Sequence, residues 1–451
     1  METPTTKQDL LFQFRGVPPI GTSVSLALQH LVAMIVGCVT PPIMIAGLIG
    51  LSQEEQVLLI QASLVMSAVS TLLQLFPIGG RFGSGLPVIL GVSFAYVPSM
   101  QAIAAGGGGI ASIAGAMIVG GVVAVIVGIF VKKIRLLFPP VITGTVVFTI
   151  GLSLYPTAIN YMAGGTGNTA EAVAAKGMSE ALVYGSWQNW VIAAFTLIVV
   201  MVLNNHARGV CKLAAILLGM LAGYAAALCF GMVSFADVGD AAWFSLPRFM
   251  HFGVSFDVAS CVALGLLFAI NSIQAIGDFT ATTVGGMDRD PTDSELQGGI
   301  IAYGVSNILA ALFGGLPTAT YSQNVGIVTT NKVVNRTVFA LTGAFLLLAG
   351  ISPKFAAVLT TIPQCVLGGA TITVFSTIAM TGMKLIASQD LTARNTTIVG
   401  LSAALGVGIS QASAALSQFP DSVTMIFGKS PVVIATLMAV LLNLILPKER
   451  G

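Results

Sequence analysis

Charged side chains are scarce in this sequence. Asp, Glu, Lys and Arg make up only 8% of the 451 residues, whereas 55% of the residues are hydrophobic. An ordinary soluble domain carries about 25% charged residues. The formal charge of +2 and the lack of a basic tract give no indication of nucleic-acid binding. With a mean hydropathy of +0.94 and apolar runs from about residue 22 to residue 446, the composition predicts a multispanning membrane protein.

Residues that bind metal ions or act in covalent catalysis are also few. The three histidines and five cysteines are widely spaced and do not have the spacing of a metal site. The cysteines lie in or beside apolar segments, which favours small core residues over a disulfide framework. Because no cluster of His, Cys or carboxylate residues occurs, we expect no metal site, no cofactor and no enzymatic activity.

The apolar runs divide into fourteen candidate spans, and the charges between them test this count. The spans are about 22–48, 56–77, 87–102, 109–131, 137–157, 188–205, 210–233, 256–280, 297–315, 317–331, 335–351, 354–381, 394–412 and 424–446. With both termini in the cytoplasm, 15 of the 19 Lys and Arg residues lie on the cytoplasmic side. The exceptions are Lys176, Arg248, Lys354 and Lys429. The positive-inside rule requires such a bias, so we predict a multi-pass protein of the plasma membrane or cell inner membrane.

The chain also resembles two diverged halves. Gly85-Leu86-Pro87 recurs as Gly315-Leu316-Pro317, an offset of 230, and Phe138–Gly144 resembles Ile362–Gly368, an offset of 224. Each half holds seven spans, and because seven is odd the halves have opposite orientations. The third and tenth spans are too short to cross about 30 Å as plain helices. The predicted fold is an all-α polytopic membrane protein of seven-plus-seven inverted repeats, with short extended stretches in segments 3 and 10, as is typical of secondary transporters.

The two broken segments supply the polar groups of a candidate site. Their leading Pro and β-branched residues favour extended backbone, and a helix is expected to begin near Ser93 and near Ser322–Asn324, because Ser and Asn are good N-caps. Two helix N-termini that meet in mid-membrane would present free N–H groups and positive dipole ends. Ser93 and Gln323 are expected at equivalent positions in the two halves.

A flat, polar, weakly acidic solute fits such a site. Gln323 offers one acceptor and two donors, which match an amide edge. Phe94 and Tyr321 are expected to stack on a ring. The alternative is that the polar stretch Gln323–Lys332 forms a helix–helix contact that only holds the bundle together.

A second polar cluster, Asn271–Asp278, lies in the eighth span. Gln274 and Asp278 share one helix face because they are four residues apart. Asp278 is the one acidic residue well inside a span, where a charge costs at least about 2.5–3.5 kcal/mol, so it must pair, bind a proton or face water. We take it as the coupling candidate, with a structural role as the alternative. His30, the only histidine inside a span, is a weaker candidate, because a lone histidine is more often a core donor than a proton relay.

These residues resemble the signature of the nucleobase–ascorbate transporters, also called nucleobase:cation symporter-2 proteins. The signature reads Gln or Glu, Asn, any residue, Gly, four residues, Thr, and Arg or Lys. Gln323, Asn324, Gly326 and Lys332 match it, and Asn331 replaces the Thr. Further likeness, spread over nearly the whole chain, lies in Ala27–Leu31, Ala275–Asp278, Gln297–Gly299 and Val366–Ala370.

The resemblance implies a core domain, a gate domain and an elevator-like movement of one against the other. The core domain would contain residues 22–131 and 256–351, and the gate domain residues 137–233 and 354–446. Members of the family often form homodimers through the gate domain, but this sequence has no decisive interface motif, so the oligomeric state stays open.

The resemblance further implies uptake of a nucleobase, usually together with protons. Signatures that begin Gln-Asn resemble the purine branch (xanthine, urate), whereas Glu-Asn resembles the uracil branch. Met162–Gly165 and Ser322–Gly326 resemble bacterial xanthine and urate permeases in particular. The residues expected to bind the base are Gln323, Gln274, Ser93, Phe94, Tyr321, Ser322 and Asn324, and those expected to act in proton coupling are Asp278 and His30.

Two departures from the family leave the coupling open. The family usually has Glu where Gln274 stands, and many purine members have Asp where Tyr303 stands. Because Gln274 cannot hold a proton, either Asp278 carries the coupling, or coupling is weak, or another ion drives transport. The alternatives are a uracil-type or uncoupled carrier, and an anion carrier of the same fold, which would favour a basic residue near the site.

Overall fold

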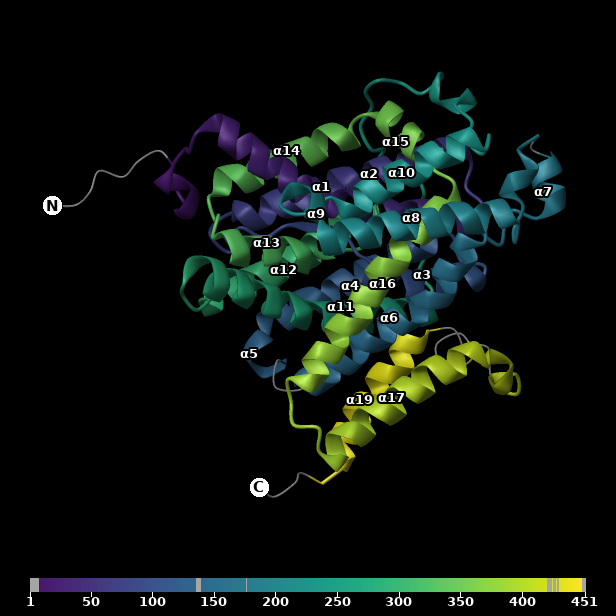
Figure 1. The fold of residues 1–451 in the computed structure, drawn as a ribbon. Coiled ribbons are helices and arrows are strands. Elements are labelled where there is room, and N and C mark those ends of the chain that lie inside the picture. The colour runs from purple at the N-terminus through teal and green to yellow at the C-terminus, as the bar shows by residue number, and fades with distance from the viewer. Residues whose placement is uncertain are drawn as a thin grey trace.

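The chain is almost entirely helical (Figure 1). The computed structural model describes residues 8–134, 139–175, 177–419, 424, 427 and 430–447. Several residues that contribute to the charge and repeat patterns lie outside the described residues: Lys7, Arg135, Phe138, Lys176, Lys429, Lys448 and Arg450.

The elements of the two halves follow one another in similar order. The first half contains η1 (Asp9–Phe12), α1 (Ile20–Ile49), α2 (Gln53–Leu75), β1 (Leu90–Val92), η2 (Phe94–Tyr96), α3 (Val97–Ala105), α4 (Ile110–Ile129), α5 (Val131–Ile134), α6 (Pro140–Met162), α7 (Ala170–Ala175), η4 (Glu180–Leu182), α8 (Trp187–His206), α9 (Val210–Leu213), α10 (Ala215–Cys229) and η5 (Ala236–Val238). The second half contains α11 (Val258–Ala281), the π-helical turn η6 (Thr282–Gly286), α12 (Asp293–Leu312), β2 (Thr318–Thr320), α13 (Ser322–Asn331), α14 (Arg336–Gly350), α15 (Pro353–Thr360), α16 (Gln364–Ala387), α17 (Ala393–Gln411), η7 (Ser413–Leu416) and α19 (Pro431–Ile445).

Local sequence signals explain where several helices begin. Ser52 and Glu55 form a capping box at the start of α2, and Thr292 and Glu295 form another at the start of α12. Each box satisfies backbone N–H groups that have no partner within the helix. Proline precedes or opens α6, α15 and α16, where its missing N–H leaves no hydrogen bond unmade.

Seven helices of the described residues are long and apolar enough to cross a membrane. They are α1, α2, α4, α6, α8, α11 continued by η6, and α16. The pair α14 and α15 also passes this test but is bent by 76°. The helices α10 and α19 are apolar but shorter. The helical multi-pass prediction is therefore confirmed, whereas the count of fourteen spans needs the shorter helices as well and stays a prediction.

The predicted span 354–381 is wrong. This stretch forms two helices, because α15 ends at Thr360 and α16 begins at Gln364. Pro363 lies at the break, where it cannot donate a backbone hydrogen bond and disfavours helical backbone in the residue before it. The short helix α15 packs against α2. The helix of this region that is long and apolar enough to cross a membrane is α16.

The helices pack in two groups. In the first group, α2 packs against α1 and α14, and α4 packs against α11 and α12. In the second group, α16 packs along α6 and α8, α8 packs along α10, and α17 packs along α19. Figure 1 shows α17 and α19 along one edge of the molecule and α14 at the opposite edge. Contacts between the groups include those of α1 with α10, α3 with α6, and α11 with α19.

The two broken segments meet as a short antiparallel pair. The strand β1 pairs with β2, with Gly91 opposite Ala319 at the centre. The pair is extended on each side by a backbone hydrogen bond, from the Ser93 N–H to the Pro317 carbonyl and from the Tyr321 N–H to the Ile89 carbonyl, both 3.0 Å. Helical structure follows each strand directly, in η2 and α3 after β1 and in α13 after β2. The prediction of two extended stretches that lead into helices is confirmed.

The register of this pair corrects one expected equivalence. The local two-fold axis passes between Gly91 and Ala319, so corresponding residues differ by 228 (319 − 91). Ser93 therefore corresponds to Tyr321, and its expected equivalence with Gln323 is wrong by two residues. The reason is that the first segment holds two more residues than the second between its proline and the centre of its strand.

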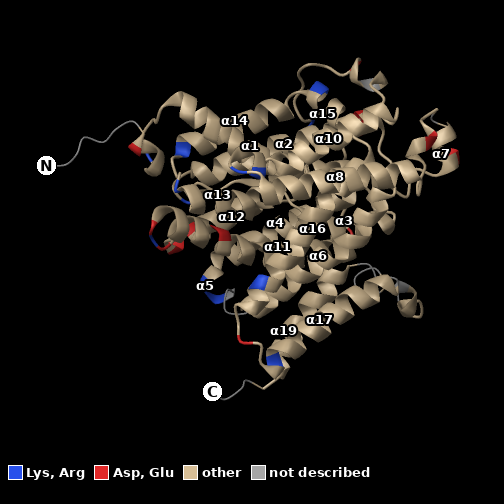
Figure 2. Cartoon of the chain, viewed as in Figure 1, with Lys and Arg blue, Asp and Glu red and all other residues tan. Residues whose placement is uncertain are grey.

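Basic side chains gather at one end of the molecule. Figure 2 shows most Lys and Arg residues on the side where both termini are drawn, near α5, α13 and α19, whereas α7 at the opposite end is acidic. The basic side chain of α15, Lys354, is one of the four predicted exceptions. This distribution agrees with the bias predicted from the loops.

The interpretation of the cysteines as small core residues applies to two of them. Cys38 and Cys365 are buried, Cys261 is half-buried, and Cys211 and Cys229 are exposed. All five are free thiols.

Candidate functional site

A cavity of about 310 Å³ lies where the two broken segments meet. The first helix group lines one wall with parts of α1, β1, η2, α11, β2 and the start of α13, and the opposite wall comes from α6, α9, α10 and α16. The lining residues are Val32, Ala33, Val36, Gly37, Val92, Ser93, Phe94, Ala95, Val147, Ile150, Leu213, Ile216, Gln274, Thr320, Tyr321, Ser322, Gln323, Val374, Thr377, Ile378 and Thr381. The cavity therefore lies between the two helix groups.

Two glutamine side chains face this cavity without protein partners. Gln323 lies in the first turn of α13 and is exposed, and Gln274 of α11 is half-buried. Among the described residues, no side-chain hydrogen bond joins either glutamine to another group. Each amide offers two N–H donors and a carbonyl acceptor, so the pair can bind donors and acceptors on the edge of a planar solute.

Ser93 and Phe94 form the part of the wall that η2 supplies. The Ser93 hydroxyl accepts a hydrogen bond from the Ala95 N–H at 3.2 Å and so caps η2. The buried Phe94 ring meets Phe375 of α16 edge to face, with ring centroids 5.1 Å apart. Phe94 therefore brings an aromatic surface to the cavity at a point where the two helix groups touch.

Tyr321 lines the cavity, but its hydroxyl is hydrogen bonded to the first broken segment. Its hydroxyl donates to the Val92 carbonyl at 2.6 Å. Its ring lies against two glycines, because a Cβ placed on Gly37 or Gly91 would come within 2.9 Å of Tyr321 ring atoms. This geometry makes Tyr321 a support for the strand pair, and its expected stacking on a solute stays a prediction.

Asp278 lies behind the cavity wall rather than in it. The residue is only 8% exposed. Its Oδ1 accepts a hydrogen bond from the Ser322 hydroxyl at 2.8 Å, and its Oδ2 accepts one from the Thr320 hydroxyl. Both hydroxyls line the cavity. Asp278 therefore reaches the solute space through two intervening hydroxyl groups.

His30 and Asn324 contact each other outside the cavity lining. Both are buried, and the Asn324 amide nitrogen lies 3.1 Å from the His30 Nδ1 and donates to the His30 carbonyl at 3.0 Å. The His30 ring also packs against Phe339 of α14. In this geometry the pair ties α1 to α13, and neither side chain touches the solute space.

The second part of the signature ends α13 rather than forming the cavity. Lys332 adopts left-handed backbone at the C-cap, and its Nζ donates to Asp288 at 2.6 Å. The Asn331 side chain accepts a hydrogen bond from the Val333 N–H at 2.9 Å. Gly326 lies one turn after Gln323 and has no atom within 4 Å of a built Cβ.

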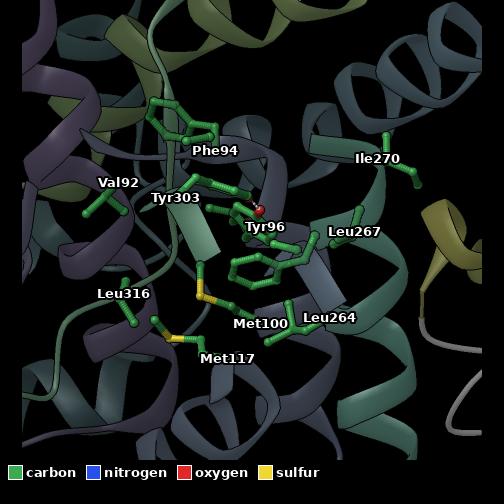
Figure 3. Close-up of a cluster of buried hydrophobic side chains, with 14 of the residues drawn as sticks. Val92, Phe94, Tyr96, Met100, Met117, Leu264, Leu267, Ile270, Tyr303 and Leu316 are labelled. Carbon is green, nitrogen blue, oxygen red and sulfur yellow. Dashed lines mark hydrogen bonds between the residues drawn. The ribbon is translucent and has the colours of Figure 1, made fainter. Parts of the chain in front are cut away.

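Tyr303 occupies a dry part of the core rather than the cavity. Its hydroxyl meets that of Tyr96, and both residues are fully buried. Figure 3 shows the two tyrosines pointing toward each other among apolar side chains that include Met100 and Leu267. Tyr303 therefore supports the segment that carries Phe94.

Sequence reasoning missed the wall that the second helix group supplies, and in the first group it missed the hydroxyl of Thr320 and the apolar lining residues Val32, Ala33, Val36, Gly37, Val92 and Ala95. Thr320 carried a signal, because it stands three residues before the signature and its hydroxyl, like that of Ser322, binds Asp278. The missed residues of the second group are Val147, Ile150, Leu213, Ile216, Val374, Thr377, Ile378 and Thr381. Apart from its two threonines this set is apolar, so it carries no pattern that separates it from lipid-facing positions.

The cavity lining contains amides, hydroxyls and apolar groups but no ionised side chain. Among the described residues no group of three or more His, Cys, Asp or Glu side chains is placed to hold a metal ion. The arrangement can bind a neutral, planar, polar solute by hydrogen bonds and aromatic contact.

The sequence is similar to known proteins over most of its length. The family model described as Permease family matches residues 21–415. The chain is 35% identical to the uric acid permease PucK of Bacillus subtilis, over 93% of this chain and 94% of that protein. It is 31% identical to the xanthine permease XanQ of Escherichia coli, over 97% of this chain and 94% of that protein. It is 33% identical to a putative purine permease of Clostridium perfringens, over 98% of this chain and 94% of that protein.

Solved structures with a similar fold are more distant in sequence. The transmembrane domain of the cyanobacterial bicarbonate transporter BicA superimposes with a TM-score of 0.56 at 14% identity, covering 91% of this chain and 97% of that one. The murine anion transporter Slc26a9 superimposes with a TM-score of 0.58 at 12% identity, covering 97% of this chain and 70% of that one. These likenesses concern the fold alone.

Proposed function

Because the chain belongs to the permease family of the nucleobase–ascorbate transporters, we propose that it is a secondary active carrier that imports a purine nucleobase, xanthine or urate, across the cell membrane. As a family member it is a transport protein and not an enzyme. The relatives named as xanthine and uric acid permeases align with it over more than nine tenths of its length, which supports the purine branch.

The observation that carries this proposal is the pair of uncommitted amides in an uncharged cavity. Gln274 and Gln323 both line the space and have no other side-chain partner among the described residues. A purine dione presents alternating N–H and C=O groups along its edges, and an amide side chain can pair with such an edge through one donor and one acceptor. Phe94 provides the aromatic surface for the ring.

Proton symport is the form of coupling that we propose, with Asp278 as the proton-binding group. The side chain is buried beside the cavity, and both of its oxygens bind hydroxyls that line the cavity. An intramembrane carboxylate without a basic partner is expected to take up and release a proton. Among the described residues, none of the ion pairs includes Asp278. For His30 we propose a structural role, because Asn324 occupies its Nδ1.

We propose elevator-type movement, which the position of the cavity between two helix groups supports. We propose a core domain of residues 22–131 and 256–351 that carries the broken segments, and a gate domain of residues 137–233 and 354–446. The packing of α15 on α2 supports moving the second boundary, so that the gate resumes at α16. The basic side chains at the end where both termini lie (Figure 2) support cytoplasmic termini.

Two other functions are weaker. A uracil-type or uncoupled nucleobase carrier would use the same cavity, and only ligand competition separates it from a purine carrier. An anion carrier is suggested by the fold of BicA and Slc26a9, but no Lys, Arg or His side chain lines this cavity. Without such a charge, an anion would depend on the N–H groups at the start of α13 alone.

A competition assay tests the proposal. Radiolabelled xanthine uptake is measured in cells that lack their own nucleobase permeases, with urate, guanine, hypoxanthine and uracil as competitors at several pH values. We expect saturable uptake that urate inhibits and uracil does not, and that a protonophore abolishes. Xanthine uptake no greater than in vector-only cells, combined with uptake of uracil or bicarbonate, would overturn the purine assignment.

A further inference from the structure

We propose that Asp278 and Ser322 form a hydrogen-bond switch, in which a proton on Asp278 converts the Ser322 hydroxyl from an acceptor into a donor toward the bound solute. This inference rests on the proposed function, because it takes the solute to be a nucleobase. It assigns to Ser322 a role in linking proton binding to base binding, without contact between the base and the carboxylate.

The ionised form of the switch follows from the observed hydrogen bonds. An ionised carboxylate can only accept hydrogen bonds. The Ser322 hydroxyl lies 2.8 Å from Oδ1 of Asp278, and the Thr320 hydroxyl contacts Oδ2. Each hydroxyl has one proton, and in this form both protons point to the carboxylate. The hydroxyls therefore offer only lone pairs to the cavity.

The protonated form reverses one of these bonds. A protonated Asp278 has an O–H group, which donates to the Ser322 oxygen from the same position. The proton of Ser322 is then released from the carboxylate and can turn into the cavity. Thr320 is 8% exposed whereas Ser322 is exposed, so the changed hydroxyl that a solute can reach is that of Ser322. The cavity gains one donor when Asp278 gains one proton.

The neighbouring amides do not provide this linkage. Gln274 and Gln323 are neutral and can turn either their oxygen or their nitrogen toward a solute. Their hydrogen-bonding character therefore does not depend on pH. The threonine hydroxyls of the opposite wall donate to backbone carbonyls instead, that of Thr377 to Thr373 at 2.9 Å and that of Thr381 to Thr377 at 2.8 Å.

Other ionisable groups near the switch have partners of their own. No ionisable side chain occurs in α3, and α4 has none either. On the remaining elements around Asp278, the groups and their partners are His30 with Asn324, Tyr321 with Val92 and Cys38, Tyr96 with Tyr303, Tyr161 with Met44, and Lys332 with Asp288. Cys261 lies more than four turns before Asp278 on the same helix, near the start of α11. Asp293 and Glu295 lie at the far start of α12, in ion pairs with Lys132 and Arg289. Asp278 is therefore the titrating group whose protonation sets the orientation of the Ser322 hydroxyl.

The consequence is a thermodynamic linkage between proton and base. A base that presents a carbonyl or ring-nitrogen lone pair to Ser322 binds more tightly when Asp278 is protonated. By reciprocity, the bound base favours proton uptake by the same factor. One hydrogen bond gained or lost corresponds to a change in dissociation constant of roughly tenfold.

Binding of radiolabelled xanthine to the purified full-length protein in lipid nanodiscs, from pH 5.5 to 8.5, tests the switch. The variant Ser322→Ala removes the hydroxyl, Ser322→Thr keeps it, and Thr377→Val removes a lining hydroxyl that is bonded to backbone. Because the titration of xanthine itself is common to all proteins, the readout is the ratio of variant to wild-type dissociation constants at each pH. We expect this ratio for Ser322→Ala to be roughly tenfold at low pH and to approach one at high pH.

The control variants separate a linkage role from a structural one. Ser322→Thr and Thr377→Val should each give a ratio that does not change with pH. A pH-independent ratio for Ser322→Ala, or a pH-dependent one for Thr377→Val, overturns the switch. If Ser322→Ala does not yield folded protein, Ser322→Gly replaces it with the same criterion. Failure of the wild type to bind xanthine or urate at any pH overturns the proposed function instead.

Discussion

At the scale of single residues, the cavity combines two free amides with a carboxylate that lies behind hydroxyls. This arrangement separates two tasks, because the amides are placed to bind the solute and Asp278 is placed to bind the proton. The composition of the segment around Gln323 made it a candidate from sequence alone, since amides at membrane depth must find a polar partner. The sequence did not reveal which neighbours are structural. Asn324 stands beside Gln323 yet turns to His30, and only the helical geometry of α13 separates their faces.

The first prediction concerns Gln323. Gln323→Ala removes up to two hydrogen bonds to the base, and we expect xanthine affinity to fall about 10- to 100-fold. Membrane expression should be unchanged, because the exposed side chain has no partner among the described residues. Uptake kinetics and quantitative blotting measure the two effects. Gln411→Ala, at the exposed end of α17, is the matched control; retained uptake with unaltered affinity in Gln323→Ala would contradict the site.

The second prediction concerns Asp278. Asp278→Asn keeps the shape of the side chain but removes the titrating group. In proteoliposomes we expect loss of pH-gradient-driven accumulation, while exchange of labelled for unlabelled xanthine continues. Asp290→Asn, in an exposed loop, should behave as wild type in both assays. Accumulation by Asp278→Asn with the wild-type pH profile would assign the coupling to another group.

At the scale of elements, proline and N-cap residues predicted the two broken segments well. Gly85-Leu86-Pro87 and its counterpart precede strands, and helical structure begins at Phe94 and Ser322 as expected. Prediction failed where an apolar run hid a break, as at Pro363, because hydropathy alone continues through a turn of the chain. The equivalence predicted for Ser93 and Gln323 also failed. The first segment has two additional residues between its proline and the centre of its strand, and such an insertion leaves the Gly-Leu-Pro motif unchanged.

The third prediction concerns the strand pair. A Cβ at Gly91 would lie 2.5 Å from the Cys38 Sγ and 2.8 Å from the Tyr321 ring. Gly91→Ala should therefore destabilise the fold by about 1–3 kcal/mol, as other overpacked cores do, and reduce transport by displacing β1. Gly408→Ala in α17, where a Cβ meets no atom within 4 Å, is the control. Thermal unfolding in detergent checks both; equal melting temperatures for the two variants would refute the close packing.

At the scale of the whole molecule, the odd number of predicted spans in each half predicts an inverted repeat, but it does not predict the cavity. Its second wall is built by residues such as Val147 and Val374, more than 200 positions apart and without polar character. No local pattern records which apolar face of α6 or α16 meets the other helix group. The family resemblance predicts the two domains, and the folded structure shows which side chains of the two helix groups line the cavity.

The fourth prediction tests movement between the two helix groups. Ser99 of α3 and Ser430, directly before α19, are buried and hydrogen bonded at 3.1 Å. In a background with the exposed Cys211 and Cys229 replaced by Ser, the double variant Ser99→Cys/Ser430→Cys should form a disulfide after small adjustments. We expect oxidation nearly to abolish xanthine uptake, and a reductant to restore it.

Single-cysteine variants at these two positions serve as controls and should be insensitive to oxidant. Xanthine uptake that persists after the cross-link has formed quantitatively would show that the groups do not slide at this contact. In that case transport would require a different motion, such as local opening of the wall around Phe94.

The strand pair also constrains how the chain can be assembled in the membrane. In the described structure β1 has β2 as its sheet partner, and β2 lies 228 residues later. Thr71 of α2 already satisfies the backbone groups of Leu90. The Ile89 and Val92 carbonyls and the Ser93 N–H, however, lack their partners in the bilayer until the ribosome has delivered Pro317–Tyr321. The nascent first half is thus an obligate intermediate with a polar gap, which membrane chaperones or early contacts with water must cover, and which two separately expressed halves would have to close in trans.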